Sequence, residues 1–83
     1  MSKKNTIVLK EARITKIIEE KDIDLVRFIV YTDDCKFTCV IKSERLQETF
    51  KRYAKVNKYV NVWGSPKLVN DYFYIIVKKM YIL

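Results

Sequence analysis

The chain has 83 residues, of which 49% are apolar and 13% aromatic, and its formal net charge is +7. This length suits one small domain. The excess of positive charge favours an acidic partner, either nucleic acid or an anionic membrane surface. The sequence contains no histidine, the commonest general base, and no glycine-rich phosphate loop. We therefore expect a non-enzymatic binding protein without a cofactor.

The sequence also bears on location and on metal binding. No apolar run approaches the ~18 residues of a membrane span, and no apolar signal-peptide core follows the basic start. We expect a cytoplasmic protein without a membrane partner, with residues 1–5 as a basic tail and residues 6–83 as one domain. Cys35 and Cys39 would lie about 13 Å apart along one strand, too far for a disulfide. We interpret both as small buried hydrophobes, and with no third cysteine we expect no metal site.

The first predicted element, Thr6–Ile18, alternates apolar and polar residues as a strand does. Its phase slips between Leu9 and Ala12, which predicts a bulge or a bend in a long first strand. The charged segment Glu19–Asp24 that follows is interpreted as a turn.

Two further strands are predicted, Leu25–Thr32 and Cys35–Lys42, joined by a tight Asp33-Asp34 turn. Alternation gives each strand an inward and an outward face. The inward residues are Val26, Phe28 and Val30 in the second strand, and Cys35, Phe37, Cys39 and Ile41 in the third. The outward residues are Arg27, Ile29 and Tyr31, and then Lys36, Thr38, Val40 and Lys42.

One helix is predicted over Ser43–Lys55, with Ser43 as its N-cap. Its apolar residues form one stripe that could close the end of a barrel: Leu46, Phe50, Tyr53 and Ala54. The cations at its end also form a basic patch, although cations are favourable there without any ligand. These cations are Lys51, Arg52 and Lys55.

The last segment, Asn57–Leu83, alternates with Val60 and Val62 inward and Trp63 outward. Gly64-Ser65-Pro66, with the only glycine and the only proline, predicts a kink before a polar turn. A closing strand is predicted over Tyr72–Lys79. The expected core of the whole chain is Val26, Phe28, Val30, Phe37, Ile41, Leu46, Phe50, Val60, Val62, Ile75 and Val77.

The alternation into Gly64 and the pattern I-x-V-x-x-M-x-x-L at the end resemble the last two strands of nucleic-acid-binding OB-folds. This group includes anticodon-binding and single-strand DNA-binding domains. The order of three strands, a helix and two strands extends the resemblance over nearly the whole chain. It implies a mainly β protein, a five-stranded barrel with one helix between strands three and four. Because the chain has only one glycine, the bends of the barrel strands must be made by bulges. The alternative to the OB-fold is a β-grasp fold, in which Thr6–Ile18 is only a short strand or an extension.

By this resemblance, a single strand of nucleic acid binds the outer face of strands two and three and the loops that flank it. The implied binding residues on the strands are Arg27, Tyr31, Lys36, Thr38 and Lys42. Those in the four-to-five loop are Lys67, Asn70, Tyr72 and Tyr74. Cations would neutralise phosphates and rings would stack on bases, so we expect little sequence preference. The expected ligand is single-stranded DNA ahead of RNA. The acidic segment Glu19–Asp24 should direct the nucleic acid to the side of strand three.

Other interpretations remain open at this point. The tyrosines can be the outer covering of a small barrel, and the lysines an ordinary solvated face. The domain can instead be a protein-interaction module, a homo-oligomer or a helper subunit of a larger nucleic-acid-processing complex. Binding that weakens steeply with salt would indicate nucleic acid rather than an apolar protein interface.

Overall fold

The structure is a computed structural model and describes residues 5–83. Of the tail predicted for residues 1–5, all but Asn5 lies outside the described residues. The elements are, in order, β1 (Ile7–Glu20), the 3-10 helix η1 (Lys21–Ile23), β2 (Leu25–Thr32), β3 (Cys35–Ile41), α1 (Glu44–Tyr53), β4 (Tyr59–Val69) and β5 (Tyr72–Ile82).

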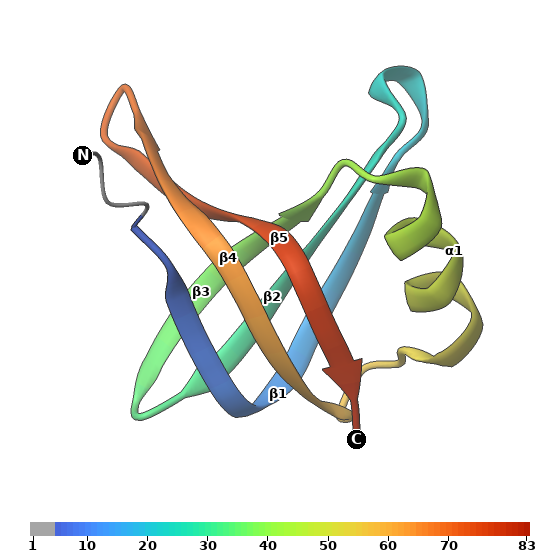
Figure 1. Cartoon of the computed structure of the whole chain (residues 1–83), viewed down its shortest axis with the longest axis horizontal. Helices are drawn as coiled ribbons and strands as arrows, with labels where there is room; N and C mark the ends of the chain where they lie inside the picture. The colour runs from blue at the N-terminus through green and yellow to red at the C-terminus, as the bar shows by residue number, and fades with distance from the viewer. Residues whose placement is uncertain (1–4) are drawn as a thin grey trace.

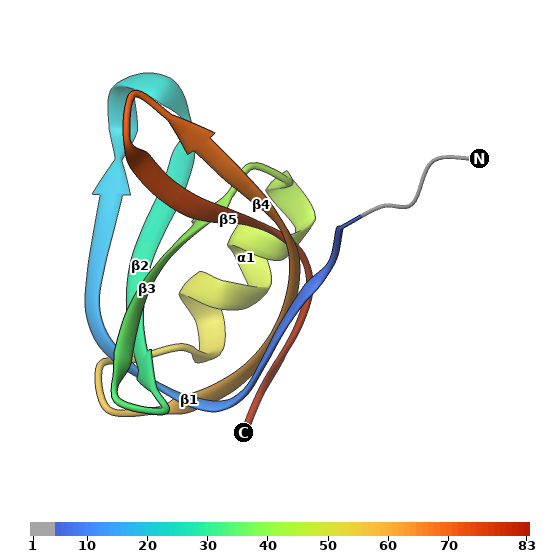
Figure 2. The same cartoon turned by 90° about the vertical axis from the view of Figure 1, so that its left-hand side faces the viewer.

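The five strands form one closed barrel in the order β1-β2-β3-β5-β4 (Figure 1). Neighbouring strands are antiparallel except β3 and β5, which are parallel. Figure 2 looks into the barrel from one end, and α1 lies behind the strands at the opposite end. The predicted five-stranded barrel with one helix between strands three and four is confirmed, and the β-grasp alternative is wrong.

The predicted bulge in the first strand is present. The pairing of β1 with β4 shifts register between Leu9 and Ala12, and Glu11 has a φ of 51°. The Glu11 amide, turned out of the ladder, donates a hydrogen bond to Asn61 Oδ1 at 2.7 Å. A second shift, between Ile14 and Lys16, lies in the pairing with β2. Bulges therefore bend β1 so that its first half pairs with β4 and its second half with β2, without any glycine.

Gly64 marks a bulge between β4 and β5. Trp63 is opposite Lys79 but Gly64 is opposite Val77, so one residue of β5 is extra. A Cβ atom on Gly64 would lie 2.5 Å from Ile76 O, closer than such atoms approach in proteins. Gly64 is therefore required for the close approach of the two backbones.

Replacing this glycine gives the first prediction. Gly64→Ala should lower the free energy of unfolding by about 1–3 kcal/mol, the usual cost of overpacking, because β5 must move away. Denaturant unfolding measures the change, and Ser65→Ala, next along β4 and only half-buried, is the matched control. A Gly64→Ala midpoint equal to that of the parent would show that the two strands separate without cost.

The kink predicted after Gly64 does not end the strand. β4 continues through Pro66 to Val69, beyond its last pairing with β1 at Gly64. Proline is tolerated there because that edge of β4 no longer needs a ladder donor. The turn is only Asn70-Asp71, whose positive φ values of 50° and 65° suit a two-residue hairpin.

The predicted four-to-five loop is therefore mostly strand. Lys67 lies in β4, Tyr72 and Tyr74 lie in β5, and only Asn70 lies in the turn. The closing strand was also predicted too short, since β5 runs from Tyr72 to Ile82.

The core fills the barrel and the space beneath α1. Phe28 and Phe50 are at its centre, with ring centroids 4.5 Å apart, and so connect β2 to α1. All predicted core residues are buried except Phe37 and Leu46, which are half-buried and pack against the core.

The two cysteines differ, and only one matches its prediction. Cys39 is fully buried, and burial raises the pKa of its thiol to about 12. Cys35 is exposed, so its prediction as a buried residue is wrong. Cys35 is the first residue of β3, directly after the Asp33-Asp34 turn, and this end of the strand does not reach the core.

The helix is shorter than predicted and buries a different set of residues. Ser43 Oγ accepts the Leu46 amide at 3.4 Å, which confirms the predicted N-cap. Tyr53 is 55% exposed because it ends the helix, so its place in the apolar stripe is wrong. Gln47 is buried instead and donates from Nε2 to the Asp24 and Ile41 carbonyls at 3.0 and 3.1 Å. These bonds tie α1 to the residue before β2 and to the last residue of β3.

Candidate nucleic-acid interface

Strand register brings several predicted binding residues onto one outer face. Tyr31 is directly opposite Lys36, and Ile29 is opposite Thr38. β3 then pairs with β5 in parallel, with Cys39 beside Ile75. Thr38 and Tyr74 precede these two residues, so they are neighbours on the outer side.

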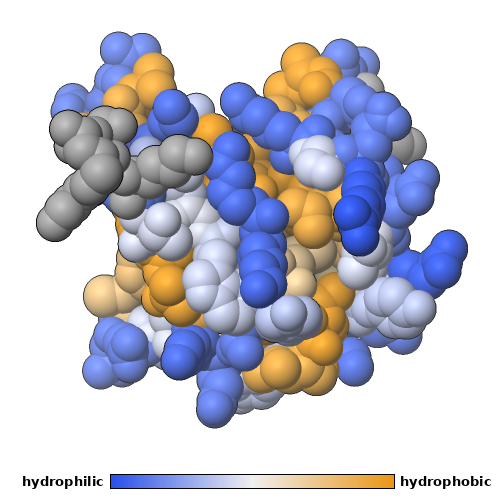
Figure 3. Space-filling view, in the orientation of Figure 1, coloured by the Kyte–Doolittle hydropathy of each residue, from blue (hydrophilic) through white to orange (hydrophobic). Residues whose placement is uncertain are grey.

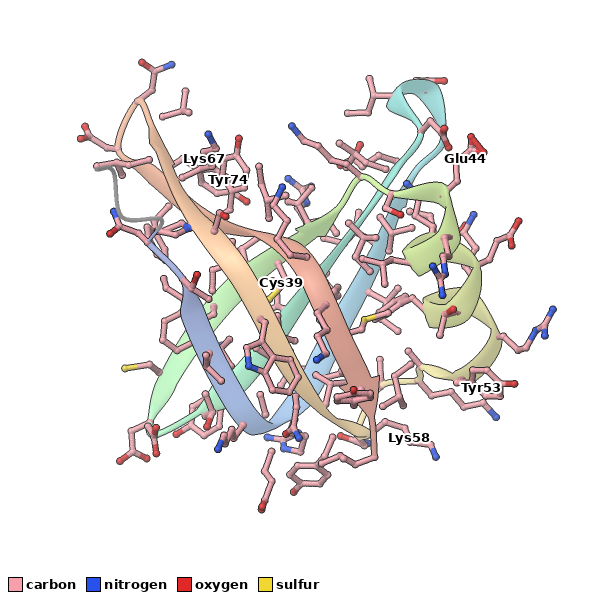
Figure 4. The ribbon with its side chains drawn as sticks, viewed as in Figure 1. Cys39, Glu44, Tyr53, Lys58, Lys67 and Tyr74 are labelled. Atoms are coloured by element: carbon pink, nitrogen blue, oxygen red, sulfur yellow. The ribbon has the colours of Figure 1, made fainter. Side chains whose placement is uncertain are left out.

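The β4–β5 hairpin extends this face. Lys67 is paired with Tyr74, and Figure 4 shows both side chains together near the base of the hairpin. The Tyr72 and Tyr74 ring centroids are 5.6 Å apart with an interplanar angle of 37°. We call the combined surface the tyrosine–lysine face, made of Tyr31, Lys36, Thr38, Lys67, Tyr72 and Tyr74.

The Tyr31 ring is held in place from two sides. Its hydroxyl donates to Asp34 Oδ1 at 3.2 Å, and the guanidinium carbon of Arg13 lies 6.0 Å from the ring centroid. The side chain is nevertheless 36% exposed. A fixed and accessible ring suits stacking, because little conformational freedom is lost when a base packs on it.

Arg13 was missed in the sequence, as was Lys16. β1 pairs with β2 so that Arg13 is opposite Tyr31 and Lys16 is opposite Ile29. Both positions follow the first bulge, which changes the alternation of β1. The sequence does show two cations, Arg13 and Lys16, in the strand after Ala12. Only the register of β1 against β2 shows that they lie beside Tyr31 and Ile29.

Arg27 and Lys42 lie nearer to α1, away from Tyr31. Arg27 Nη2 forms an ion pair with Glu20 Oε1 at 2.8 Å, with both side chains about one third exposed. The pair partly neutralises Arg27, because β1 continues into the acidic segment that was predicted to be wholly a turn. Lys42 is exposed just after β3, immediately before the Ser43 cap.

Apolar residues lie between the tyrosine–lysine face and the region of Arg27 and Lys42. Val40 and Ile76 are neighbours across β3 and β5 and are only 6% and 8% exposed. Val40 was predicted to lie on the outward side, but it is buried. Val40 and Ile76 therefore separate the tyrosine–lysine face from the region of Arg27 and Lys42.

The basic patch of α1 is less suited to phosphate. Lys51 borders a small surface pocket whose lining also includes Asp24, Glu44 and Glu48. These carboxylates would repel a polyanion that approached Lys51.

Within residues 5–83, no three His, Cys, Asp or Glu side chains gather where they could hold a metal ion. Over the same range, no helix has the length and apolar character needed to cross a membrane.

Comparison with known proteins gives fold-level matches. No protein-family description matches the sequence, and no curated protein does either. The mitochondrial single-stranded DNA binding protein of S. cerevisiae superposes with a TM-score of 0.84 at 11% identity, covering 99% of this chain and 98% of that one. The SSB domain of a Synechococcus sp. protein superposes with a TM-score of 0.75 at 15% identity, covering 98% of each chain.

At these identities the likeness shows the fold alone. It agrees with the strand order, the parallel β3–β5 contact and the helix between β3 and β4. The protein has the OB fold.

Proposed function

We propose that this protein binds single-stranded DNA on the tyrosine–lysine face and catalyses no reaction. The observation that carries the proposal is the placement of Tyr31, Tyr72 and Tyr74 beside Lys36 and Lys67 on one outer surface. Rings that stack on bases, next to ammonium groups that meet phosphates, are the two parts of a single-strand site. The fold-level match to proteins described as single-stranded DNA binding supports the same function.

The proposed binding depends little on base sequence. Stacking uses the π-face that every base has, and the lysines contact phosphates common to all sequences. The strand would approach from β3 and the hairpin, because Glu19 and Glu20 make the opposite side acidic. We propose DNA ahead of RNA, and a titration that compares oligo-dT with oligo-rU tests this preference.

The contribution of the lysines gives the second prediction. Lys36→Ala and Lys67→Ala should each weaken binding and flatten the plot of log affinity against log salt by about 0.7, the single-strand increment per phosphate contact. Binding isotherms at several salt concentrations measure the slope.

The matched control for these variants is Lys55→Ala, which removes one exposed cation after α1. It should leave the slope unchanged. If Lys55→Ala flattened the slope and Lys36→Ala and Lys67→Ala did not, the site would be at the helix patch instead.

A second candidate function, docking of another protein, is favoured by the tip of the β4–β5 hairpin. Leu68, Val69 and Phe73 are 69%, 51% and 40% exposed there. An apolar interface of this kind would change little with salt, whereas phosphate binding weakens steeply. A Leu68→Ser variant that lost a partner but kept oligo-dT affinity would support this candidate.

A further inference from the structure

A groove lies on the outer side of β4, beside the Gly64 bulge. Its volume is about 660 Å³, and the residues that line it include Trp63, Lys67 and Lys78 and the hydroxyl residues Thr6 and Ser65. Among the described residues that line it, none is Asp or Glu. Figure 3 shows this side of the molecule, where hydrophilic and intermediate side chains lie next to one another over β4 and β5.

The Trp63 ring belongs to a second cluster of aromatic and cationic groups. Tyr81 meets it edge to face, with ring centroids 5.6 Å apart at an interplanar angle of 89°. Lys79 Nζ lies 5.3 Å from the Trp63 centroid and 5.4 Å from the Tyr81 centroid. These contacts hold the Trp63 ring in place, and Trp63 is also one of the residues that line the groove.

Lys67 connects this groove to the tyrosine–lysine face. It lines the groove and is also paired with Tyr74 across β4 and β5. Trp63, Ser65 and Lys67 alternate on the outer side of β4, so the indole is about 13 Å along the strand from Lys67. One surface therefore runs from Tyr74 past Lys67 to Trp63 without leaving the hairpin.

We infer that this groove is a second nucleotide subsite, in which a base stacks on Trp63 and its flanking phosphates meet Lys67 and Lys78. The inference rests on the proposed function, since the strand reaches the groove from Tyr74. The ligand class follows from charge: a second copy docked here would oppose lysines to lysines, whereas a polyanion is attracted by them. An indole has a large ring face for stacking, which is sequence-tolerant.

The single tryptophan makes the subsite directly observable. Intrinsic fluorescence is followed while the protein is titrated with oligo-dT of about 4 to about 16 nucleotides, the range of site sizes per OB fold. Anisotropy of labelled oligo-dT reports binding independently. Long oligomers should quench Trp63 and short ones should quench it much less, although both bind.

Variants separate the two parts of the surface. Trp63→Leu and Lys78→Ala should lower affinity for long oligomers, Trp63→Leu by about 5- to 150-fold, and leave affinity for the shortest ones unchanged. Trp63→Tyr should retain most of the affinity, and Lys55→Ala should bind as the parent does. Circular dichroism confirms that each variant is folded, and Lys78→Ala tests the groove without altering the indole.

Two negative results have different meanings. If anisotropy shows binding but long oligomers leave Trp63 fluorescence unchanged, and Lys78→Ala has parental affinity at every length, the subsite is refuted and the proposed function stands. If anisotropy shows no binding at any length, the proposed function fails and the subsite fails with it.

Discussion

Phe28→Ala should lower the free energy of unfolding by roughly 3–5 kcal/mol, the usual cost of removing a buried phenyl ring. The ring is fully buried and lies 4.5 Å from the Phe50 ring, centroid to centroid. Alanine would leave a cavity between the barrel wall and α1, in a domain whose whole stability is of order 5–15 kcal/mol. Thermal and denaturant unfolding, followed by circular dichroism, measure the loss.

The matched control is Phe73→Ala, which removes the same ring from the exposed hairpin tip. Away from core features, surface changes usually stay within about 0.5 kcal/mol, so this variant should melt close to the parent. The opposite order, with Phe73→Ala less stable than Phe28→Ala, would contradict the core described above.

Tyr31→Ala should weaken single-strand binding by ~1–3 kcal/mol, the range measured for aromatic platforms. Every 1.4 kcal/mol or so is a tenfold loss of affinity. Tyr31 is opposite Lys36 and near Arg13, so a stacked base would have its phosphate within reach of a cation. The salt slope should change little, because the substitution removes no charge.

Two further variants show whether the ring itself acts in binding. Tyr31→Phe keeps the ring and loses the hydroxyl bond to Asp34, so its affinity should be nearly parental. Tyr53→Ala removes another exposed tyrosine from the end of α1 and should bind normally. Full affinity in a folded Tyr31→Ala protein would mean that Tyr31 only covers the barrel.

Much of the fold could be predicted because strand alternation is local. Val26, Phe28 and Val30 point inward simply because they are two residues apart, and Val60 and Val62 follow the same rule. The β1 bulge was also visible, since a bulge changes the phase of the pattern on either side of it.

Features that depend on distant pairing could not be predicted in the same way. The parallel contact of β3 with β5 places Thr38 beside Tyr74, and nothing local to either residue indicates it. The length of β4 depends on where β1 stops pairing, which decides whether Pro66 can remain in a strand. Gly64-Ser65-Pro66 therefore suggested a long loop, and Lys67 and the site residues near it were assigned to that loop.

The placement of Arg13 illustrates the same limit at the candidate site. Its position opposite Tyr31 depends on two register shifts in β1, one against β4 before Arg13 and one against β2 after it. A one-residue error in either shift would put Arg13 on the other face. Tyr31 of β2 and Lys36 of β3 were easier to predict because the two-residue Asp33-Asp34 turn sets their register.

The central claim, single-strand binding through phosphate contacts and stacking, is tested most directly by one competition titration. Labelled oligo-dT bound to the protein is challenged with unlabelled oligo-dT or duplex DNA at two salt concentrations. Oligo-dT should compete much better than duplex, whose bases are already stacked, and its affinity should fall steeply as salt rises. Equal competition by duplex, or an affinity that does not change with salt, would contradict the account.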